Sequence, residues 1–411
     1  MTALQSETRP RPVVSRGEFV AMIAMLMATV AFSVDAMLPA LPQIAEDVAG
    51  GDVTDAALVV ATFMAGMGLG TLFAGPLSDA YGRHPVALGG AAIYIPAALA
   101  GALAQSIEFL LVARFIQGLG ASGPRIVALA IVRDLFSGRQ MAQTISFIMT
   151  VFAIVPVLAP SLGALLAWAF SWRGIFVAFA LFSIISITWL RLRQPETLLP
   201  EKRRPFRMRM LAAGLVEILR TPMVARAILA QSMVYSVLFI ALMTSQPVID
   251  EVFGRAATFP FWFGVVALIS AGASFLNAAV VVRVGMPRVV RTSLAATAGY
   301  ALFFLIYMTA IDGSGDVTFF LFLILLCAGF SLAGLCIGNL NAIAMQPLGH
   351  IAGLAASTIS ALSTSLGALL AAPATVFFDG TALPAAIGLL ISTIVALIVA
   401  QGLAETEDVP I

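Results

Sequence analysis

Twelve long apolar runs dominate the sequence and limit what it can fold into. A helix that crosses a bilayer needs about 20 predominantly apolar residues. Lipid offers no hydrogen bonds, so a spanning segment must satisfy its own backbone groups, which a helix does. We therefore predict an all-α membrane protein with twelve transmembrane helices, at 19–41, 55–76, 85–105, 109–131, 142–168, 174–190, 223–247, 258–282, 289–310, 317–341, 351–377 and 382–402.

The composition agrees with this prediction and excludes several classes of protein. Of the 411 residues, 61% are apolar and only 10% are charged, against about 25% charged in soluble proteins. Cys327 and Cys336 fall in one apolar run and are expected to be core residues. The chain has two histidines, no nucleotide-binding loop sequence and no catalytic triad pattern. We therefore expect no enzyme activity, no metal or organic cofactor and no nucleic-acid partner.

Arginine and lysine predict the orientation, because cytoplasmic loops are enriched in both. The connection 191–222 carries eight basic residues, whereas the loops expected outside carry only Arg173 and Arg255. The polar segment before residue 19 contains three arginines and resembles the start of a signal peptide. The apolar run that follows it is too long for one. We predict a multi-pass protein with both termini in the cytoplasm.

The basic connection 191–222 also divides the chain. We predict an N-terminal six-helix bundle at 1–190, a cytoplasmic basic linker at 191–222 and a C-terminal six-helix bundle at 223–411. Residues 208–219 within the linker form either a short amphipathic helix on the inner membrane surface or part of a simple tether.

An internal repeat indicates that the two bundles arose by duplication. The sequence Ser-Leu-Gly-Ala-Leu-Leu occurs at 161–166 and again at 365–370, an offset of 204 residues. The turn at 75–85 has a degraded copy at 282–288 with almost the same offset, although the copy lacks an aspartate. Parallel repeats around a central site are typical of one large group of transporters.

The turn itself reads Gly-Pro-Leu-Ser-Asp-Ala-Tyr-Gly-Arg-His-Pro from residue 75. It resembles the signature of the loop between helices 2 and 3 in the major facilitator superfamily. The resemblance implies two pseudo-symmetric six-helix bundles. The site between them is expected to open alternately to the two sides of the membrane. The resemblance also implies an inner gate formed by Gly75, Asp79, Gly82 and Arg83. In this gate Asp79 is expected to pair with an arginine such as Arg133, or with the N-terminus of the eleventh helix.

Asp35 in the first helix and Arg114 in the fourth are charged residues within apolar runs. Charges inside a membrane are costly and mark functional sites by default. Both residues lie near the outer ends of their helices, at similar depths. An apolar surrounding favours the neutral form of a carboxyl group, whereas a nearby guanidinium favours the charged form. The pair is therefore a candidate for proton coupling, and the alternative is a fixed buried ion pair that only aligns two helices.

Two further motifs narrow the resemblance. Residues 33–42 match S-x-D-x-x-L-P-A-L-P, and residues 114–121 match R-x-x-Q-G-x-G-A. Both runs, and Arg-Asp-Leu-Phe from Arg133, are similar to the bicyclomycin- and chloramphenicol-resistance branch of the drug:proton antiporters. The resemblance implies that a monomer in the inner membrane of a bacterium exports small lipophilic drugs, driven by the proton gradient.

Polar residues in several predicted helices are candidates for a largely apolar substrate cavity. They are Gln117, Gln231, Tyr235, Asn277, Asn339 and Asn341. The fifth helix keeps only Pro160 and Gly163 of the G-P-x-x-G-G motif common in antiporters. A kinked helix that packs closely through Gly163 explains these two residues equally well.

Some alternatives stay open at this point. Arg125 could attract an anionic substrate, or serve the inner gate together with Asp79 and Arg133. The protein could instead be a facilitator-type transporter of one metabolite, such as an amino acid or a sugar. A sensor or scaffold that has lost transport is a further alternative.

Overall fold

A computed structural model describes residues 14–203, 205–206, 208–311 and 315–403. Eleven helical stretches within these ranges are long and apolar enough to cross a membrane. The main helices are α1 (Arg16–Asp35), α2 (Leu41–Val48), α3 (Val53–Tyr81), α4 (Arg83–Ala102), α5 (Ile107–Leu135), α6 (Gly138–Arg193), α7 (Met208–Arg220), α8 (Pro222–Pro247), α9 (Phe259–Val284), α10 (Met286–Ala310), α11 (Asp316–Leu332), α12 (Gly338–Met345), α13 (Ala352–Val376) and α14 (Leu383–Gln401).

Helix α6 contains two of the predicted membrane helices. Its 56 residues would extend about 84 Å, far more than the hydrocarbon core of about 30 Å. The helical conformation is interrupted at Phe170 and Ser171, where Ser171 has a φ of 62°. Beyond the break, Trp172 donates from its backbone N–H to Gln43 and from its indole to Asp47. These contacts fix the reversal, so the eleven stretches contain the twelve predicted helices.

Two predicted helices are less regular than expected. The first was predicted to continue to residue 41, but α1 ends at Asp35 and is followed by a 3-10 turn (Leu38–Ala40) and α2. Pro39 and Pro42 explain this difference, because proline lacks the N–H that a continuous helix needs. The tenth predicted helix is α11 and α12 joined by a π-turn at Ala333–Ile337.

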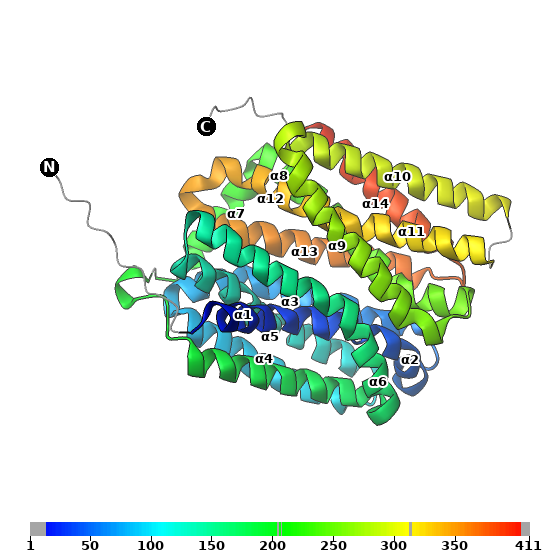
Figure 1. The fold of residues 1–411 in the computed structure, drawn as a ribbon, viewed down its shortest axis with the longest axis horizontal. Helices are drawn as coiled ribbons and strands as arrows, with labels where there is room; N and C mark the ends of the chain where they lie inside the picture. The colour runs from blue at the N-terminus through cyan, green and yellow to red at the C-terminus, as the bar shows by residue number, and fades with distance from the viewer. Residues whose placement is uncertain (1–13, 204, 207, 312–314, 404–411) are drawn as a thin grey trace.

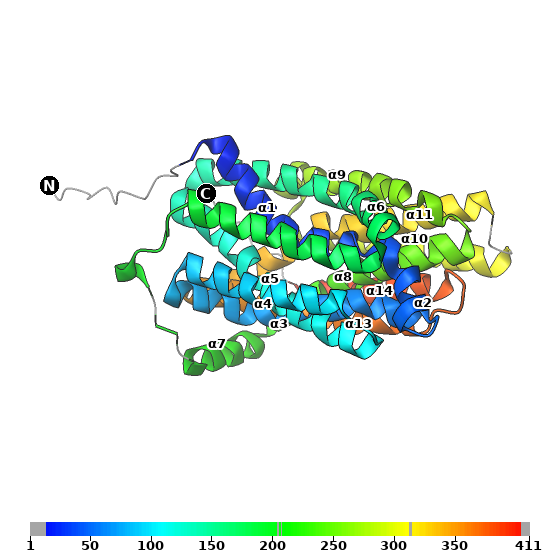
Figure 2. The ribbon, with the colours of Figure 1, turned by 90° about the horizontal axis from the view of Figure 1, so that it is seen from below.

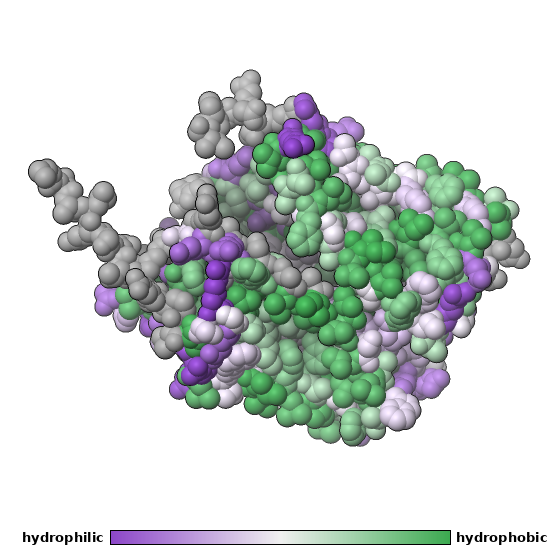
Figure 3. Space-filling view, in the orientation of Figure 1, coloured by the Kyte–Doolittle hydropathy of each residue, from purple (hydrophilic) through white to green (hydrophobic). Residues whose placement is uncertain are grey.

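The helices form two groups that run side by side along the long axis of the molecule. Figure 1 shows α1 to α6 mainly below and α8 to α14 mainly above. The groups meet where α3 packs against α13 and where α6 packs against α9. In Figure 3 an apolar belt covers the middle of the visible face, and polar residues gather toward its ends. This arrangement is that of a multi-pass membrane protein.

At one end of the molecule, here called the linker end, each group of helices has both the start of its first helix and the end of its last helix. The Arg193 side chain at the end of α6 pairs with Glu18 in the first turn of α1 at 2.6 Å. Arg226, near the start of α8, donates to the carbonyl oxygen of Gly402 just beyond α14. The first and last described helices therefore begin and end on the same side, as the predicted topology requires.

The connection between the groups is partly helical. Helix α7 lies outside both groups at the linker end (Figure 2) and contacts α8 and α13. Gly214 faces Leu354 so closely that a Cβ at Gly214 would collide with its side chain. Of the two alternatives for residues 208–219, the structure shows the helix, and it is packed on the protein. The bundle boundaries themselves stay a prediction.

The two copies of the repeated hexapeptide make equivalent contacts. Gly163 in the first copy lies against the backbone of Ala36, directly after α1. Gly367 in the second copy lies against Tyr235 and the carbonyl oxygen of Ser232 in α8. A Cβ on either glycine would collide with these atoms. Small residues let membrane helices approach this closely, so each half uses the repeat to hold its fifth helix against its first.

Replacing Gly163 with alanine tests this role. The added Cβ would overlap the carbonyl oxygen of Ala36, and overpacking of this kind costs about 1–3 kcal/mol. We expect Gly163→Ala to lower the thermal unfolding midpoint of the detergent-purified protein. Gly272→Ala is the matched control, because a Cβ at Gly272 would meet nothing within 4 Å. Equal midpoints for the two variants would contradict the proposed close contact.

Candidate functional site

Arg114 is the most deeply enclosed charge in the described structure. Its residue surface is 0% exposed. The guanidinium donates from Nε to the Val59 carbonyl at 3.1 Å and from Nη2 to the Ser33 carbonyl at 2.9 Å. It donates from Nη1 to Gln117 Oε1 at 2.8 Å. The ring of Phe63 lies 4.4 Å from its central carbon. Arg114 thereby joins α1, α3 and α5.

All partners of Arg114 are neutral. A charged arginine at the bilayer centre costs about 2.5–3.5 kcal/mol on insertion scales. A hydrogen bond to a charged group contributes about 1.5–3 kcal/mol, and a desolvated cation–π contact about 2 kcal/mol. Three such bonds and the Phe63 ring are enough to hold the cation without a carboxylate.

Asp35 lies at the end of α1 and is 7% exposed. It is two residues after Ser33, whose carbonyl oxygen binds Arg114. The structure gives the Asp35 carboxylate no hydrogen bond or ion pair with any described residue. The structure thus brings the predicted pair into one region without a direct bond between the side chains. A negative charge on Asp35 has no fixed partner there.

The surroundings of Asp35 are held rigidly by other contacts. The Ser33 hydroxyl lies 2.5 Å from the Tyr94 hydroxyl and also donates to the carbonyl of Thr29. On the other side, Gly163 allows α6 to reach the backbone of Ala36. Pro160, one turn earlier in α6, is buried. The residues predicted from the helix-5 motif therefore lie beside the end of α1.

The described contacts join the predicted cavity residues only in part. Gln117 lies beside Arg114, and its Nε2 has no hydrogen-bond partner in the described structure. In α8, Gln231 is buried with an unpaired Oε1, and Tyr235 stacks on Phe239 at 5.7 Å. Asn339 donates to Asn277 at 2.8 Å and to the carbonyl of Leu335 in the π-turn. Asn341 is half-buried.

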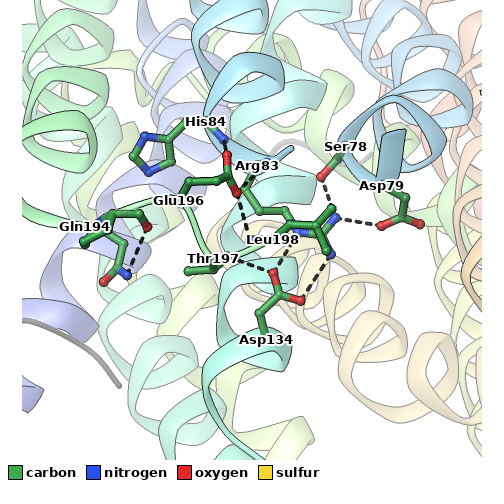
Figure 4. Close-up of polar contacts among 10 residues, drawn as sticks. Ser78, Asp79, Arg83, His84, Asp134, Gln194, Glu196, Thr197 and Leu198 are labelled. Atoms are coloured by element: carbon green, nitrogen blue, oxygen red, sulfur yellow. Dashed lines mark hydrogen bonds and ion pairs between the residues drawn. The ribbon is translucent and has the colours of Figure 1, made fainter. Parts of the chain in front are cut away.

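The predicted gate residues are joined at the linker end (Figure 4). Arg83 binds Asp79 at 2.7 Å and Ser78 at 2.8 Å. The same side chain binds both carboxylate oxygens of Asp134, at 2.8 and 3.1 Å. Asp79 therefore pairs with Arg83 across the turn. The expected pairing with Arg133 is absent: Arg133 is exposed, and its neighbour Asp134 takes the central place.

The two glycines of this turn have clear steric roles. Gly82 has a φ of 107°, which L side chains rarely adopt, and its turn separates α3 from α4. Gly75 faces Ser357 of α13, where an added Cβ would lie 3.1 Å from the serine Cβ. The gate sequence therefore also forms part of the contact between the two groups of helices.

Glu196 is a member of this network that sequence reasoning missed. Its carboxylate accepts from the backbone N–H groups of Arg83 at 3.0 Å and His84 at 2.9 Å, which are the first two residues of α4. It also accepts from the N–H of Leu198 at 3.0 Å. Thr197 donates to Asp134 at 2.8 Å. The linker thus caps α4, because a carboxylate at a helix N-terminus satisfies free N–H groups.

The environment of Glu196 favours its charged form. Burial by itself would raise the pKa of this carboxyl group. The three backbone donors, together with His84, outweigh burial and hold the pKa below its ordinary value of 4.5. A group with a lowered folded pKa stabilises the folded state fully above its ordinary pKa, and this contribution is lost as the pH falls through the lowered value. The cap is therefore fully charged at neutral pH.

Replacing Glu196 with alanine tests the cap. Loss of a capping side chain costs about 1 kcal/mol, so we expect hydrogen exchange at Leu198 and in the first turn of α4 to become several-fold faster near neutral pH. Glu201→Ala is the control, because Glu201 is an exposed carboxylate in the same linker. Exchange that is equally unaffected in both variants would show that Glu196 does not hold the linker.

Comparison with known proteins identifies the family. Residues 21–372 match the family model described as Major Facilitator Superfamily. The chain is 29% identical over 280 residues to a bicyclomycin resistance protein homolog of Haemophilus influenzae, covering 67% of this chain and 70% of that protein. It is 40% identical over 153 residues to the multidrug resistance protein MdtL of Escherichia coli, covering 37% and 38%. These relatives confirm the predicted resemblance to the drug-resistance branch.

Solved structures support the same fold. The human organic anion transporter MFSD10 superposes with a TM-score of 0.67 at 19% identity, over 95% of this chain and 100% of that one. A D-xylose-proton symporter superposes with a TM-score of 0.70 at 13% identity, over 94% and 97%. The chain belongs to the Major Facilitator Superfamily.

Proposed function

We propose that this protein is an antiporter that exports small lipophilic compounds from the cytoplasm in exchange for protons. The relatives named for bicyclomycin and multidrug resistance support drug efflux. The observation that carries proton coupling is the buried carboxylate of Asp35, which has no described partner and follows by two residues the Ser33 carbonyl that binds Arg114. The mechanism is alternating access between the two groups of helices.

Asp35 has the properties that a coupling carboxyl group needs. Burial without a hydrogen bond favours its neutral, protonated form, whereas the Arg114 charge favours the ionised form. The arginine cannot move freely to Asp35, because three of its N–H groups are bound elsewhere. A change in helix packing or an approaching substrate can therefore tip the balance, and one proton is bound and released in each cycle.

The gate network supplies the conformational part of the cycle. Arg83 binds Asp79 and Asp134, while Gly75 packs on Ser357 of the opposite group. The Asp79 side chain is 44% exposed, whereas that of Arg83 is 8% exposed. Asp79 is thus the more easily released partner. We propose that its contact forms in one state and breaks in the other, which shifts the population between the two states.

The proposal includes the orientation and the site of substrate binding. Eight basic residues in 191–222 favour a cytoplasmic linker end in the inner membrane of a bacterium. The buried, incompletely paired amides of Gln117 and Gln231, with the stacked ring of Tyr235, are proposed to contact the substrate. We propose that Asn277 and Asn339 contribute to the same cavity as a pair.

Asp35→Asn tests the coupling role. The amide cannot exchange a proton, so we expect substrate-driven proton movement in reconstituted vesicles to fall to background while substrate binding persists. The assay uses a panel of lipophilic antibiotics that includes bicyclomycin, with a pH-sensitive dye inside the vesicles. Glu108→Gln is the control, because Glu108 is an exposed acid near the same end of the bilayer. Undiminished exchange in the Asp35 variant would remove Asp35 from the mechanism.

Asp79→Asn tests the gate. Loss of the Arg83 contact should slow transport several-fold, because one conformation loses a stabilising interaction of about 1 kcal/mol. Substrate affinity should stay nearly constant, since Asp79 lies twenty residues further along α3 than Val59, which is bonded to Arg114 next to Gln117. The measurement is initial transport rate against substrate concentration. A large loss of affinity at normal turnover would contradict the gating role.

A further inference from the structure

Arg125 is a charged residue of α5 that the mechanism above does not use. Its Nη1 atom is buried and has no hydrogen-bond partner in the described structure. No ion pair or aromatic contact of its guanidinium with a described residue is present either. Arg125 therefore differs sharply from Arg114, whose guanidinium is bound on three sides.

The position of Arg125 relates it to Arg114. It lies eleven residues further along α5, which is about three turns and about 16 Å toward the linker end. At about 100° per residue, the two side chains leave the helix within about 20° of each other. Both arginines therefore share one face of α5, with Arg114 deep in the bundle and Arg125 nearer the linker end.

Side chains along α5 become more accessible toward the linker end. Arg125 and Leu129 are half-buried, and Arg133, four residues further, is exposed. By contrast, Arg114 and Gln117 are fully buried. Arg125 is thus the first charge on this face that a molecule entering from the linker end meets within the membrane-spanning part of α5.

Four acidic groups at the linker end have other partners. Asp79 and Asp134 bind Arg83, and Glu196 binds backbone N–H groups. Glu18 binds Arg193. None of these carboxylates pairs with Arg125 in the described structure. Within the described part of the chain, the Arg125 guanidinium thus lies in a membrane span without a counter-charge, an arrangement expected for a substrate pathway.

We propose that Arg125 is an anion-binding subsite that takes the carboxylate of an amphiphilic substrate with an apolar body. This inference rests on the proposed transport function and names the substrate class of the same pathway. A guanidinium binds a carboxylate through two parallel N–H···O bonds. The apolar part of the ligand then lies along the largely apolar helix faces deeper in the protein.

Arg114 does not serve the same purpose. Three of its five N–H groups are bound within the protein, and the guanidinium is 0% exposed. A carboxylate at Arg114 would have to displace the Ser33 or Val59 carbonyl and leave it unpaired. A carboxylate that binds Arg125 displaces no such carbonyl, so Arg125 is the residue that selects substrates by their negative charge.

A matched pair of probes tests the proposal. 1-Naphthaleneacetate and its neutral amide, 1-naphthaleneacetamide, differ in the charge of one group. We expect the purified full-length protein to bind the carboxylate about tenfold more tightly, which corresponds to about 1.4 kcal/mol, in titration calorimetry. Arg125→Gln should abolish this preference and leave affinity for the amide unchanged. Arg125→Lys should keep part of it, since lysine retains the charge but not the paired donors.

Control measurements separate the possible outcomes. Arg209→Gln removes an exposed positive charge in α7 and should keep the full preference for the carboxylate. Equal affinity of the wild-type protein for both probes, or no measurable binding of either, contradicts the proposal. A preference that survives in Arg125→Gln also contradicts it. Failure of the antiport function would show instead as binding with the expected preference but without proton movement in vesicles.

Discussion

The hydrogen bonds of Arg114 are the interaction on which the N-terminal group of helices depends. The guanidinium joins the carbonyl of Ser33 in α1 to that of Val59 in α3 and to Gln117 in its own helix. Removing this side chain would leave two carbonyls without their donor and open a large void. Because all three acceptors are neutral, the protein keeps a full positive charge in place. In the proposed mechanism that charge acts on Asp35, whose carboxylate has no partner among the described residues.

The N-terminal group of helices also depends on close contact between its helices. Without a hydrophobic driving force between helices in lipid, packing depends on how near the backbones can come. Gly66 faces the carbonyl oxygen of Phe115, and Gly118 faces that of Phe63, so α3 and α5 lie in direct backbone contact. This proximity is what allows Arg114 to reach across to Val59. The glycines and the arginine are therefore one structural unit.

Much of the fold could be predicted from the sequence because lipid imposes a simple length rule. The apolar runs are local patterns that predicted the spanning helices, apart from the breaks after Asp35 and at Ala333–Ile337. The turn from Gly75 to Arg83 is also a local pattern, and it predicted the break between α3 and α4. The chain reversal at Ser171 is different, because the lengths of the apolar runs predict where a reversal falls but not its backbone conformation. Its backbone conformation depends on Trp172 bonding to Gln43 and Asp47, more than a hundred residues earlier.

Contacts between distant segments were the part that sequence could not supply. Arg133 and Asp134 are adjacent in the sequence. Only the rotation of α5 about its own axis decides which of the two side chains faces Arg83. Glu196 stands in a proline-containing linker with no pattern that predicts a cap. Glu196 lies in a polar run, but the two N–H groups that it caps in α4 lie 112 and 113 residues away in the sequence. Similarly, equal depth placed Asp35 near Arg114 without showing that the arginine would be bound by carbonyls.

Arg114 and Arg125, two of the three arginines of α5, show why the number of charges in a membrane helix says little about function. Both residues share one helix face, yet one is bound by neutral groups and the other has an unpaired nitrogen. A bound guanidinium resists displacement and acts through its field, whereas an unpaired one gains free energy from any anion that reaches it. The fixed electrostatic role that we propose for Arg114 agrees with its three bonds. The anion-binding role that we propose for Arg125 agrees with its unpaired nitrogen nearer the linker end.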